Sequence, residues 1–410
     1  MNSVEPLATE VMARIDELAA ISETPGQLTR RYLTAEHRQV NAVVGQWMVA
    51  AGMTVHQDAA GNIVGRYEGV PGDGPALIMG SHLDTVVNAG KFDGMLGVLC
   101  AIACVQALSQ QGRRMTFPIE VIGFADEEGV RFGTTYLGSR AIAGNLDPQT
   151  LDRTDNDGIS FRQAMTEFGL DAATIGAAAR QAGEVMAFLE LHIEQGPVLE
   201  ALDLPAGAVT AINGQTRLSV AITGEAGHAG TVPMTLRRDA LAVAAEGVLA
   251  VETICGEGDD VVGTVGIIQA SPGAINVIPG DVTFTVDVRA RDDPARRDAV
   301  AAVIRAIRAA AERRGCIAQI TVLHRAASAP CSENMTAVIE RAIADVGITP
   351  TRMPSGAGHD AAAMAELCDV GMIFLRSDGG ISHNPAERTS REDIAAGIKV
   401  MLAVLDQLEG

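Results

Sequence analysis

Short apolar runs alternate with helical patterns through the first two hundred residues of the chain. Residues 76–80, 119–125 and 186–193 are runs of apolar side chains that predict buried strands, and residues 372–375 predict another. Between them, residues 95–108 have the apolar pattern of a buried helix. Such alternation is typical of an α/β domain, so we expect a mostly parallel sheet covered by helices.

A different pattern begins near Asn213. It predicts six elements, in the order strand, helix, strand, strand, helix, strand, at residues 217–223, 239–255, 261–270, 282–290, 293–314 and 317–324. This order defines the ferredoxin-like α+β unit. We therefore expect an inserted domain over residues 213–327. Residues 1–212 and 328–410 should form one discontinuous catalytic domain, because the last predicted strand and the residues after it complete the same kind of site.

Composition and charge narrow the choice of partner. At 410 residues the chain is long enough for two or three domains. Its formal net charge of −20 argues against nucleic acid and anionic membranes, since both need a basic protein face. No apolar run approaches the roughly 20 residues of a membrane span, and charges within residues 1–20 argue against a signal peptide. The six cysteines form no C-x-x-C pair, so we expect reduced thiols and a cytoplasmic location.

Histidines and carboxylates gather just after the predicted strands. They lie in five short segments, residues 80–85, 92–94, 126–129, 191–196 and 380–385. The carboxyl ends of strands in an open α/β sheet line the ligand crevice, so these segments should converge there. Histidine with aspartate or glutamate, and without cysteine, is the ligand set for a divalent metal such as zinc or manganese.

Two features of these segments suggest how such a site works. Asp93 is our choice for a carboxylate that bridges two metals, because its neighbour Gly94 permits a tight backbone. In the pair Glu127-Glu128, one carboxylate would bind metal and the other would accept a proton from water. A lone histidine at a strand end is more often structural, and an acidic pair is more often solvated, so the prediction depends on all these residues meeting. The motifs of serine hydrolases, P-loop proteins, H-E-x-x-H proteases and dinucleotide-binding folds are absent.

The motif segments together resemble a known family. They are residues 80–85, 90–97, 126–138, 191–196, 224–233, 355–360 and 380–389. They resemble the carbamoylase branch of the metal-dependent exopeptidase superfamily, which includes allantoate amidohydrolase, N-carbamoyl-L-amino-acid hydrolase and β-ureidopropionase. Aminoacylase and carboxypeptidase G are more distant relatives. The resemblance covers essentially the whole chain, so it implies an exopeptidase-like catalytic domain and an inserted ferredoxin-like domain that acts as lid and dimerisation surface.

Carried over position by position, the resemblance implies two divalent metal ions per subunit. Zinc or manganese is expected, with cobalt or nickel also possible. The implied ligands are His82, Asp93 and His192 for one metal, and Asp93, Glu128 and His383 for the other. Glu127 matches the general base, and Asp84 matches the carboxylate that orients a metal-bound imidazole.

The resemblance also implies that the inserted domain contacts the substrate. His228 matches the family histidine that polarises the scissile carbonyl and stabilises the oxyanion. Polar substrate contacts are matched by Gln215, Asn276 and Arg289. Arg289 would clamp a carboxylate with two parallel hydrogen bonds, although without the resemblance a surface salt bridge is the better interpretation. His359 and Asp360 are expected to line the site. A homodimer through the inserted domain and a closing hinge are implied, and whether the lid residues act across the dimer stays open.

The expected activity is hydrolysis of a ureido (carbamoyl) C–N bond in a small carboxylate-bearing substrate. Residues 126–138 and 380–389 most resemble allantoate amidohydrolase, which predicts conversion of allantoate to ureidoglycine, ammonia and carbon dioxide in purine catabolism. An N-carbamoyl-L-amino acid is the alternative substrate, with β-ureidopropionate or a dipeptide-like amide after it. A non-catalytic binding protein of the same fold is a further alternative, and the intact set of five ligands plus Glu127 argues against it.

Overall fold

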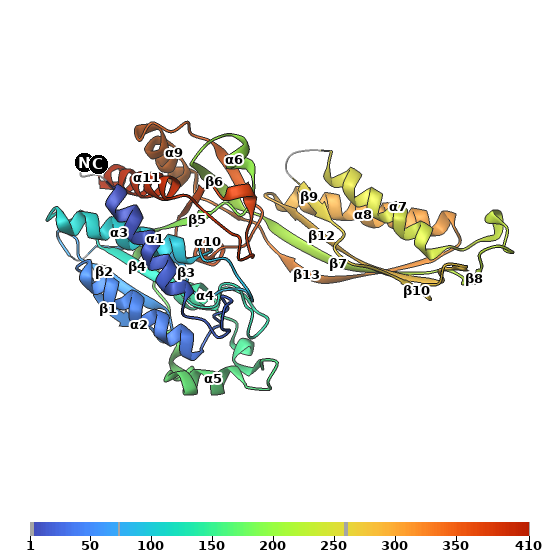
Figure 1. Ribbon diagram of the computed structural model, residues 1–410, viewed down its shortest axis with the longest axis horizontal. Coiled ribbons are helices and arrows are strands. Elements are labelled where there is room, and N and C mark those ends of the chain that lie inside the picture. Colours follow the sequence, from blue (N-terminus) through green and yellow to red (C-terminus); the bar gives the residue numbers. More distant parts are fainter. Residues whose placement is uncertain (1–3, 73, 258–260, 410) are drawn as a thin grey trace. The chain divides into compact units, whose positions relative to one another are not determined.

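Two compact units make up the part of the chain that the computed structural model describes, which is residues 4–72, 74–257 and 261–409. Unit 1 comprises Met1–Thr210 and Cys331–Gly410, and unit 2 comprises Ala211–Pro330 (Figure 1). Unit 2 begins at residue 211, where the sequence predicted an insertion from 213, and it ends at residue 330 rather than 327. Each unit has its own hydrophobic core.

Unit 1 is built on a nine-stranded sheet in the order β1-β2-β4-β3-β5-β16-β6-β14, with β15 paired to β6; the last two residues of β6 and all of β14 fall within unit 2. The strands are β1 (Thr54–Gln57), β2 (Ile63–Tyr67), β3 (Ala76–His82), β4 (Ile119–Phe124), β5 (Val185–Ile193), β6 (Ala206–Ile212), β14 (Ala329–Pro330), β15 (Arg352–Ser355) and β16 (Val370–Leu375). The α-helices are α1 (Glu5–Ala19), α2 (Ala35–Ala50), α3 (Met95–Gln110), α4 (Leu137–Ala143), α5 (Phe161–Phe168), α6 (Val198–Ala201), α9 (Glu333–Asp345), α10 (Asp360–Met364) and α11 (Arg391–Glu409). Short 3-10 helices are η1 (Pro148–Asp152), η2 (Ala172–Ala178) and η4 (Asp378–Gly380).

The four central strands, β4, β3, β5 and β16, run parallel to one another. Antiparallel strands flank them on both sides. Every side chain of β3, β4 and β16 is buried, as expected for strands covered on both faces. The predicted parallel centre is confirmed, and because parallel strands end at one edge, His82 and His192 are brought to the same edge of the sheet.

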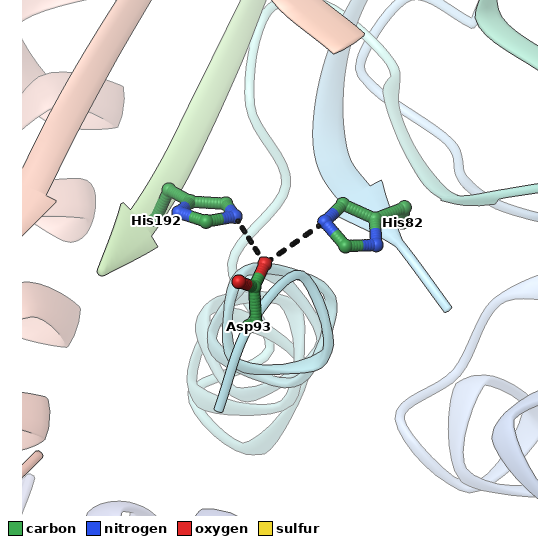
Figure 2. Close-up of side chains that lie close together, drawn as sticks. All are labelled: His82, Asp93 and His192. Atoms are coloured by element: carbon green, nitrogen blue, oxygen red, sulfur yellow. Dashed lines mark ion pairs between the residues drawn. The ribbon is translucent and has the colours of Figure 1, made fainter. Parts of the chain in front are cut away.

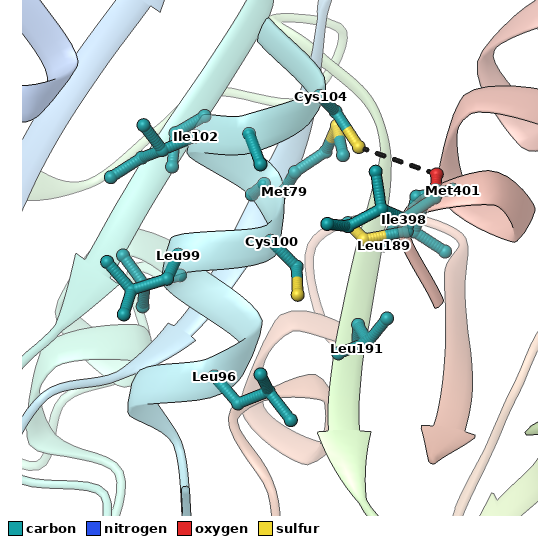
Figure 3. Close-up of a cluster of buried hydrophobic side chains, with 14 of the residues drawn as sticks. Met79, Leu96, Leu99, Cys100, Ile102, Cys104, Leu189, Leu191, Ile398 and Met401 are labelled. Carbon is teal, nitrogen blue, oxygen red and sulfur yellow. Dashed lines mark hydrogen bonds between the residues drawn. The ribbon is translucent and has the colours of Figure 1, made fainter. Parts of the chain in front are cut away.

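Helix α3 lies at the centre of the unit 1 core. Its cysteines, Cys100 and Cys104, are fully buried among side chains such as Leu189, Leu191 and Met401 (Figure 3). Burial raises the pKa of both thiols. These two residues therefore serve as small apolar side chains, and all six cysteines of the chain are free.

Unit 2 contains an antiparallel sheet and two long helices. The strand order is β10-β12-β7-β13, and β9 also pairs with β12. Its elements are β7 (Gly214–Thr223), β8 (Gly227–His228), η3 (Met234–Leu236), α7 (Ala240–Cys255), β9 (Val261–Thr264), β10 (Ile268–Ser271), β11 (Val277–Ile278), β12 (Asp281–Ala290), α8 (Asp293–Arg313) and β13 (Ile317–Ala326). Helices α7 and α8 pack on each other and against β7 and β12. The predicted separate ferredoxin-like unit is confirmed, and the two-stranded ribbon of β8 and β11 is an addition to it.

One detail of unit 2 differs from the prediction. The single strand predicted over residues 261–270 is two strands, β9 and β10, which pair with different halves of β12. Between them the Thr285 N–H still donates to the Ile267 carbonyl oxygen at 3.0 Å, but the Ile267 N–H donates to the Thr285 hydroxyl at 3.2 Å instead of to a backbone carbonyl. The apolar pattern continues through this break, so the sequence did not predict it.

Among the residues that the structure describes, none of the helices has the length and apolar character that a membrane span requires.

Candidate metal centre

Two imidazoles and one carboxylate meet at the carboxyl edge of the central strands (Figure 2). His82 is the last residue of β3, His192 lies next to the last residue of β5, and Asp93 stands just before α3. Asp93 Oδ1 lies 3.2 Å from His82 Nε2 and 3.1 Å from His192 Nε2. All three side chains are buried and all three sit on or beside regular elements, which fixes their geometry.

A second group shares Asp93 with the first. His383 Nε2 lies 3.4 Å from Asp93 Oδ2 and 3.5 Å from Glu128 Oε1. Within each group the candidate ligand atoms all lie within 4.8 Å of one another. The structure therefore brings together the five residues that the family resemblance implied as ligands, with Asp93 between the two groups. The side chain of His383 is half exposed, which leaves the second group nearer to solvent.

The Nε2 atoms of both imidazoles face Asp93, and His192 Nε2 also accepts the Gly94 N–H at 3.3 Å. His82 Nδ1 lies 3.0 Å from the Asp84 carbonyl oxygen, and His192 Nδ1 lies 2.8 Å from the Ile193 carbonyl oxygen. A carbonyl oxygen only accepts, so each Nδ1 carries a proton. In a neutral ring Nε2 is then an acceptor that faces a carboxylate oxygen, which is another acceptor. A cation between them resolves the conflict, and the nitrogen and oxygen donors suit a divalent metal.

The site also carries a buried excess of negative charge. Burial by itself lowers the pKa of His82, but the hydrogen bond to Asp93 and the charge of Glu127 raise that pKa well above its ordinary value. Burial and the Asp93 carboxylate raise the pKa of Glu128 to about 7. Both shifts come from carboxylates crowded together away from water, and a bound cation would relieve that repulsion.

Unusual backbone conformations accompany these residues. Asp126, Gln195 and His383 have φ angles of 57°, 59° and 53°, in the left-handed region that residues other than glycine rarely adopt. Gly94 has φ of 68°, and a Cβ added there would lie 2.5 Å from the His82 ring. Glycine at this position is therefore required by the backbone and by the neighbouring imidazole, as well as allowing the turn predicted beside Asp93.

Asp84 connects the first histidine to the acidic turn. Its carboxylate accepts hydrogen bonds from the N–H groups of Glu127 at 2.9 Å and Glu128 at 3.2 Å. Its carbonyl oxygen lies 3.0 Å from His82 Nδ1, whereas its carboxylate Oδ1 lies 3.8 Å away. In this structure the backbone of Asp84 therefore orients the imidazole, and its side chain fixes the turn that carries the two glutamates.

Glu127 lies beside the candidate ligands without joining either Asp93 group. Its carboxylate shares a cluster with His82 and Glu128, in which the ligand atoms lie within 4.8 Å of one another. Burial raises the pKa of Glu127 well above that of an ordinary glutamate, with the charge of His82 opposing and that of Glu128 adding. A carboxylate that readily holds a proton at this place suits general acid and base chemistry.

His359 packs against His192. The ring centroids lie 4.4 Å apart in an edge-to-face contact, and His359 Nε2 lies 2.7 Å from Ser355 Oγ. Burial lowers the pKa of His359 well below its ordinary value, so the ring is neutral. The next residue, Asp360, is buried and accepts a hydrogen bond of 2.6 Å from Ser139 Oγ. The contact between the two rings suits a His359 that holds the His192 ring in place. Contact of His359 with substrate stays a prediction.

Three side chains that hold Asp93 were not singled out from the sequence. Gln195 Nε2 and Ser382 Oγ lie 2.7 Å and 3.0 Å from Asp93 Oδ2. Glu387 Oε1 accepts the N–H groups of Phe92 and Asp93 at 2.8 Å and 3.0 Å. All three residues belong to motif segments noted in the sequence, which was the available signal, but their common partner is visible only in three dimensions.

The four predicted contact residues of unit 2 form two separate pairs. Gln215 lies opposite Arg289 across β7 and β12, and both donate hydrogen bonds to Asp287. His228 lies in the β8–β11 ribbon, where the neighbouring Ala229 N–H donates to the Asn276 carbonyl oxygen. The ribbon follows the last residue of β7, whereas Gln215 is near its start, so most of a ten-residue strand separates the pairs. At about 3.3 Å per residue that is roughly 26 Å.

The fold and the site together define a class of protein. A mixed α/β unit with histidines and carboxylates at the ends of its central strands, joined to a separate antiparallel unit, is the architecture of a metal-dependent hydrolase. The chain belongs to the peptidase family M20/M25/M40, whose model matches residues 78–407. This family is metal-dependent, and the groups around Asp93 provide residues that could hold a metal.

Known proteins resemble this chain over nearly its whole length. It is 43% identical over 396 residues to the N-carbamoyl-L-amino acid amidohydrolase of Geobacillus stearothermophilus, covering 96% of this chain and 97% of that protein. It is 42% identical over 437 aligned positions to a probable allantoate deiminase of Oryza sativa subsp. japonica, covering 98% of this chain and 89% of that protein. The crystal structure of an amidase of the hydantoinase/carbamoylase family from Burkholderia multivorans has a TM-score of 0.92 at 32% identity, covering 98% of each chain.

These similarities confirm the resemblance to the carbamoylase branch that the motif segments predicted. They also confirm the predicted enzyme class, a hydrolase of C–N bonds other than peptide bonds.

Proposed function

We propose that this chain is a two-metal amidohydrolase that cleaves a ureido C–N bond of allantoate, giving ureidoglycine, ammonia and carbon dioxide. The observation that carries the proposal is the arrangement around Asp93. Five candidate ligands from distant parts of the chain meet there, with the carboxylate of Glu127 beside them. Without a cation, His82 and His192 can face Asp93 only if each ring carries a second proton and a positive charge, so the cluster is arranged to hold positive charge beside Asp93.

The proposed centre has two cation positions that share Asp93. The residues that would hold the cations are His82, Asp93 and His192 for one, and Asp93, Glu128 and His383 for the other. Divalent cations held there would supply Lewis-acid activation of the attacking water and of the scissile carbonyl. Imidazole and carboxylate donors suit zinc or manganese, and also cobalt or nickel. The backbone carbonyls that accept from Nδ1 of His82 and His192 keep both Nε2 atoms aimed at the first position.

Glu127 moves the proton in the proposed reaction. It accepts a proton from the water that attacks the carbamoyl carbon, and it returns that proton to the leaving nitrogen, which becomes the amine of ureidoglycine. The other product is carbamate, which breaks down to ammonia and carbon dioxide. Asp84 holds the backbone of Glu127 at 2.9 Å, so the base keeps its place beside His82. His228 would stabilise negative charge on the carbonyl oxygen.

The two residue pairs of unit 2 support a homodimer. Arg289 and Gln215 would bind the substrate carboxylate and amide, while His228 and Asn276 would bind the scissile ureido group. A molecule as small as allantoate cannot touch both pairs of one chain, because most of β7 separates them. We therefore propose that two chains pair through unit 2 and that one pair of contacts at each site comes from the partner chain.

Allantoate suits the polar character of these contacts. It has two ureido groups and a carboxylate on a single carbon, so the group that is not cleaved still needs hydrogen-bond partners. Amide and imidazole side chains such as Gln215, Asn276 and His228 can provide them. The 42% identical rice protein named for allantoate supports this choice. An N-carbamoyl-L-amino acid is the second candidate, and the 43% identical Geobacillus protein favours it.

Ammonia release tests the proposal. The protein is stripped with a chelator, reloaded with Mn²⁺ or Zn²⁺, and assayed with allantoate and with N-carbamoyl-L-methionine. We expect release only after reloading, with the higher kcat/KM for allantoate. A higher kcat/KM for N-carbamoyl-L-methionine would select the second candidate, and no release from either substrate would refute a ureido amidohydrolase.

We also propose a cytoplasmic location, since six free cysteines suit a reducing compartment.

A further inference from the structure

The second oxygen of Asp93 is crowded with hydrogen-bond donors. Gln195 Nε2 lies 2.7 Å from Asp93 Oδ2, and Ser382 Oγ lies 3.0 Å from it. A carboxylate oxygen has two lone-pair positions, so these donors occupy both. The same oxygen lies 3.4 Å from His383 Nε2 in the second candidate metal group. A cation in that group therefore competes with one of the two donors for a lone pair.

Ser382 is the donor that can turn away. Its hydroxyl has one proton, and Oγ lies 3.0 Å from each of two acceptors, Asp93 Oδ2 and Glu387 Oε2. Gln195 Nε2 lies 3.2 Å from Ser382 Oγ, so the serine oxygen can accept while its proton points to either carboxylate. Rotation of the hydroxyl about its C–O bond is enough to change partners, and no heavy atom needs to move.

Glu387 is fixed where it can receive that proton. Its Oε1 accepts the N–H groups of Phe92 and Asp93 at 2.8 Å and 3.0 Å. The residue is only 3% exposed, and its side chain fills the space beside Gly90, where an added Cβ would come within 2.3 Å of it. With Oε1 held by the backbone, Oε2 faces the hydroxyl of Ser382.

We propose that Glu387 is a positioning residue that takes the Ser382 hydrogen bond when a cation occupies Asp93 Oδ2. The hydroxyl turns from Asp93 to Glu387, which frees one lone pair of the bridging carboxylate while its backbone stays in place. No covalent bond changes in this step. The inference rests on the proposed metal centre and adds to it a residue outside the set of ligands.

Glu387→Gln tests this switch because the amide reverses one contact. The amide oxygen can still accept the N–H groups of Phe92 and Asp93, but the NH2 group then donates to Ser382 Oγ. The serine proton is thereby kept on Asp93, where it opposes the cation. We expect the apparent Kd of the weaker-bound Zn²⁺, measured by competition with a chromophoric chelator, to rise about 10- to 100-fold.

Removal of the hydroxyl distinguishes this effect from simple loss of charge. Ser382→Ala leaves no proton to oppose the cation, so its Zn²⁺ Kd should stay within about threefold of wild type, and the Ser382→Ala/Glu387→Gln double variant should return to the same value. The matched control is Ser390→Ala, because the Ser390 hydroxyl also donates to a carboxylate, that of Asp393 at 2.7 Å, but this carboxylate is not a candidate ligand. Combined with Glu387→Gln, it should leave Zn²⁺ binding weak.

The outcomes separate the inference from the proposed function. Unchanged Zn²⁺ affinity in Glu387→Gln, or a double variant as weak as Glu387→Gln alone, would overturn the switch and leave the metal centre in place. A wild-type protein that takes up fewer than two Zn²⁺ ions would overturn both. Circular dichroism checks that each variant is folded. If Glu387→Gln is not, Glu387→Ala also removes the acceptor, so it should weaken Zn²⁺ binding and be rescued by Ser382→Ala.

Discussion

The carboxylate of Asp84 offers a direct test of how the acidic turn is held. Asn at this position keeps the shape and one acceptor oxygen, which can serve the N–H of Glu127, but its NH2 group then faces the N–H of Glu128. One hydrogen bond to a buried charged group is lost, which corresponds to about 1.5–3 kcal/mol. The backbone carbonyl that orients His82 is unchanged. We therefore expect Asp84→Asn to displace Glu127 and Glu128 and to leave the first metal group, His82, Asp93 and His192, in place.

Rates of ammonia release from allantoate measure the consequence for kcat/KM. A loss of that size corresponds to a decrease of roughly 10- to 150-fold, while the first metal should remain bound. Asp239→Asn is the control for the Asp-to-Asn change itself, because one oxygen of Asp239 accepts both backbone N–H groups, from Leu241 at 2.9 Å and Ala242 at 3.2 Å, and the Asn oxygen can keep both. It should leave kcat/KM unchanged. Wild-type kcat/KM in Asp84→Asn, or loss of the first metal, would refute this reasoning.

Three further predictions address separate parts of the chain. Glu127→Gln should keep its metal content and lower kcat about 10²- to 10⁴-fold, and undiminished turnover would remove Glu127 from proton transfer. Gly94→Ala places a Cβ 2.5 Å from the His82 ring, so Zn²⁺ binding should be lost. Gly112→Ala, which also has positive φ but open space around it, should only destabilise the fold by about 1 kcal/mol in urea unfolding, and equal Zn²⁺ loss in both would contradict the steric argument. Burial lowers the pKa of His37 from 6.5 to about 3. As the pH falls from 6.5 towards 3, the unfolded chain binds a proton at His37 that the folded chain does not bind. The stability that is present above pH 6.5 is therefore lost as the pH falls through this range. The free energy of unfolding should decrease by up to about 1.4 kcal/mol per pH unit in this range, and His37→Gln should show a shallower slope.

The parallel centre of the fold could be predicted because its strands are covered on both faces. Continuous apolar runs such as 119–125 are the direct consequence of that burial. Strands β1 and β15 escaped prediction for the opposite reason. Each has four residues and polar, partly exposed side chains, so pairing with a neighbouring strand defines it more than its own sequence does.

The candidate ligands could be predicted because imidazoles and carboxylates stand out in a chain with only eight histidines. The residues that support them could not. Glu387 and the N–H of Asp93 are 294 residues apart in sequence, and Gln195 is 102 residues from Asp93. A buried glutamate or glutamine has no distinctive spacing, so its partner is known only once the chain is folded.

Strand β16 lies between β5 and β6 in the sheet. In sequence, however, β16 follows both of these strands and is separated from them by nearly the whole of unit 2. A ribosome therefore releases β5 and β6 long before the strand that joins them, and in the meantime both expose unpaired backbone edges. Unit 2 has its complete set of strands by then and can fold first. A chain truncated before residue 370 should consequently be found in the insoluble fraction after expression, because β5 and β6 keep unpaired backbone edges without β16.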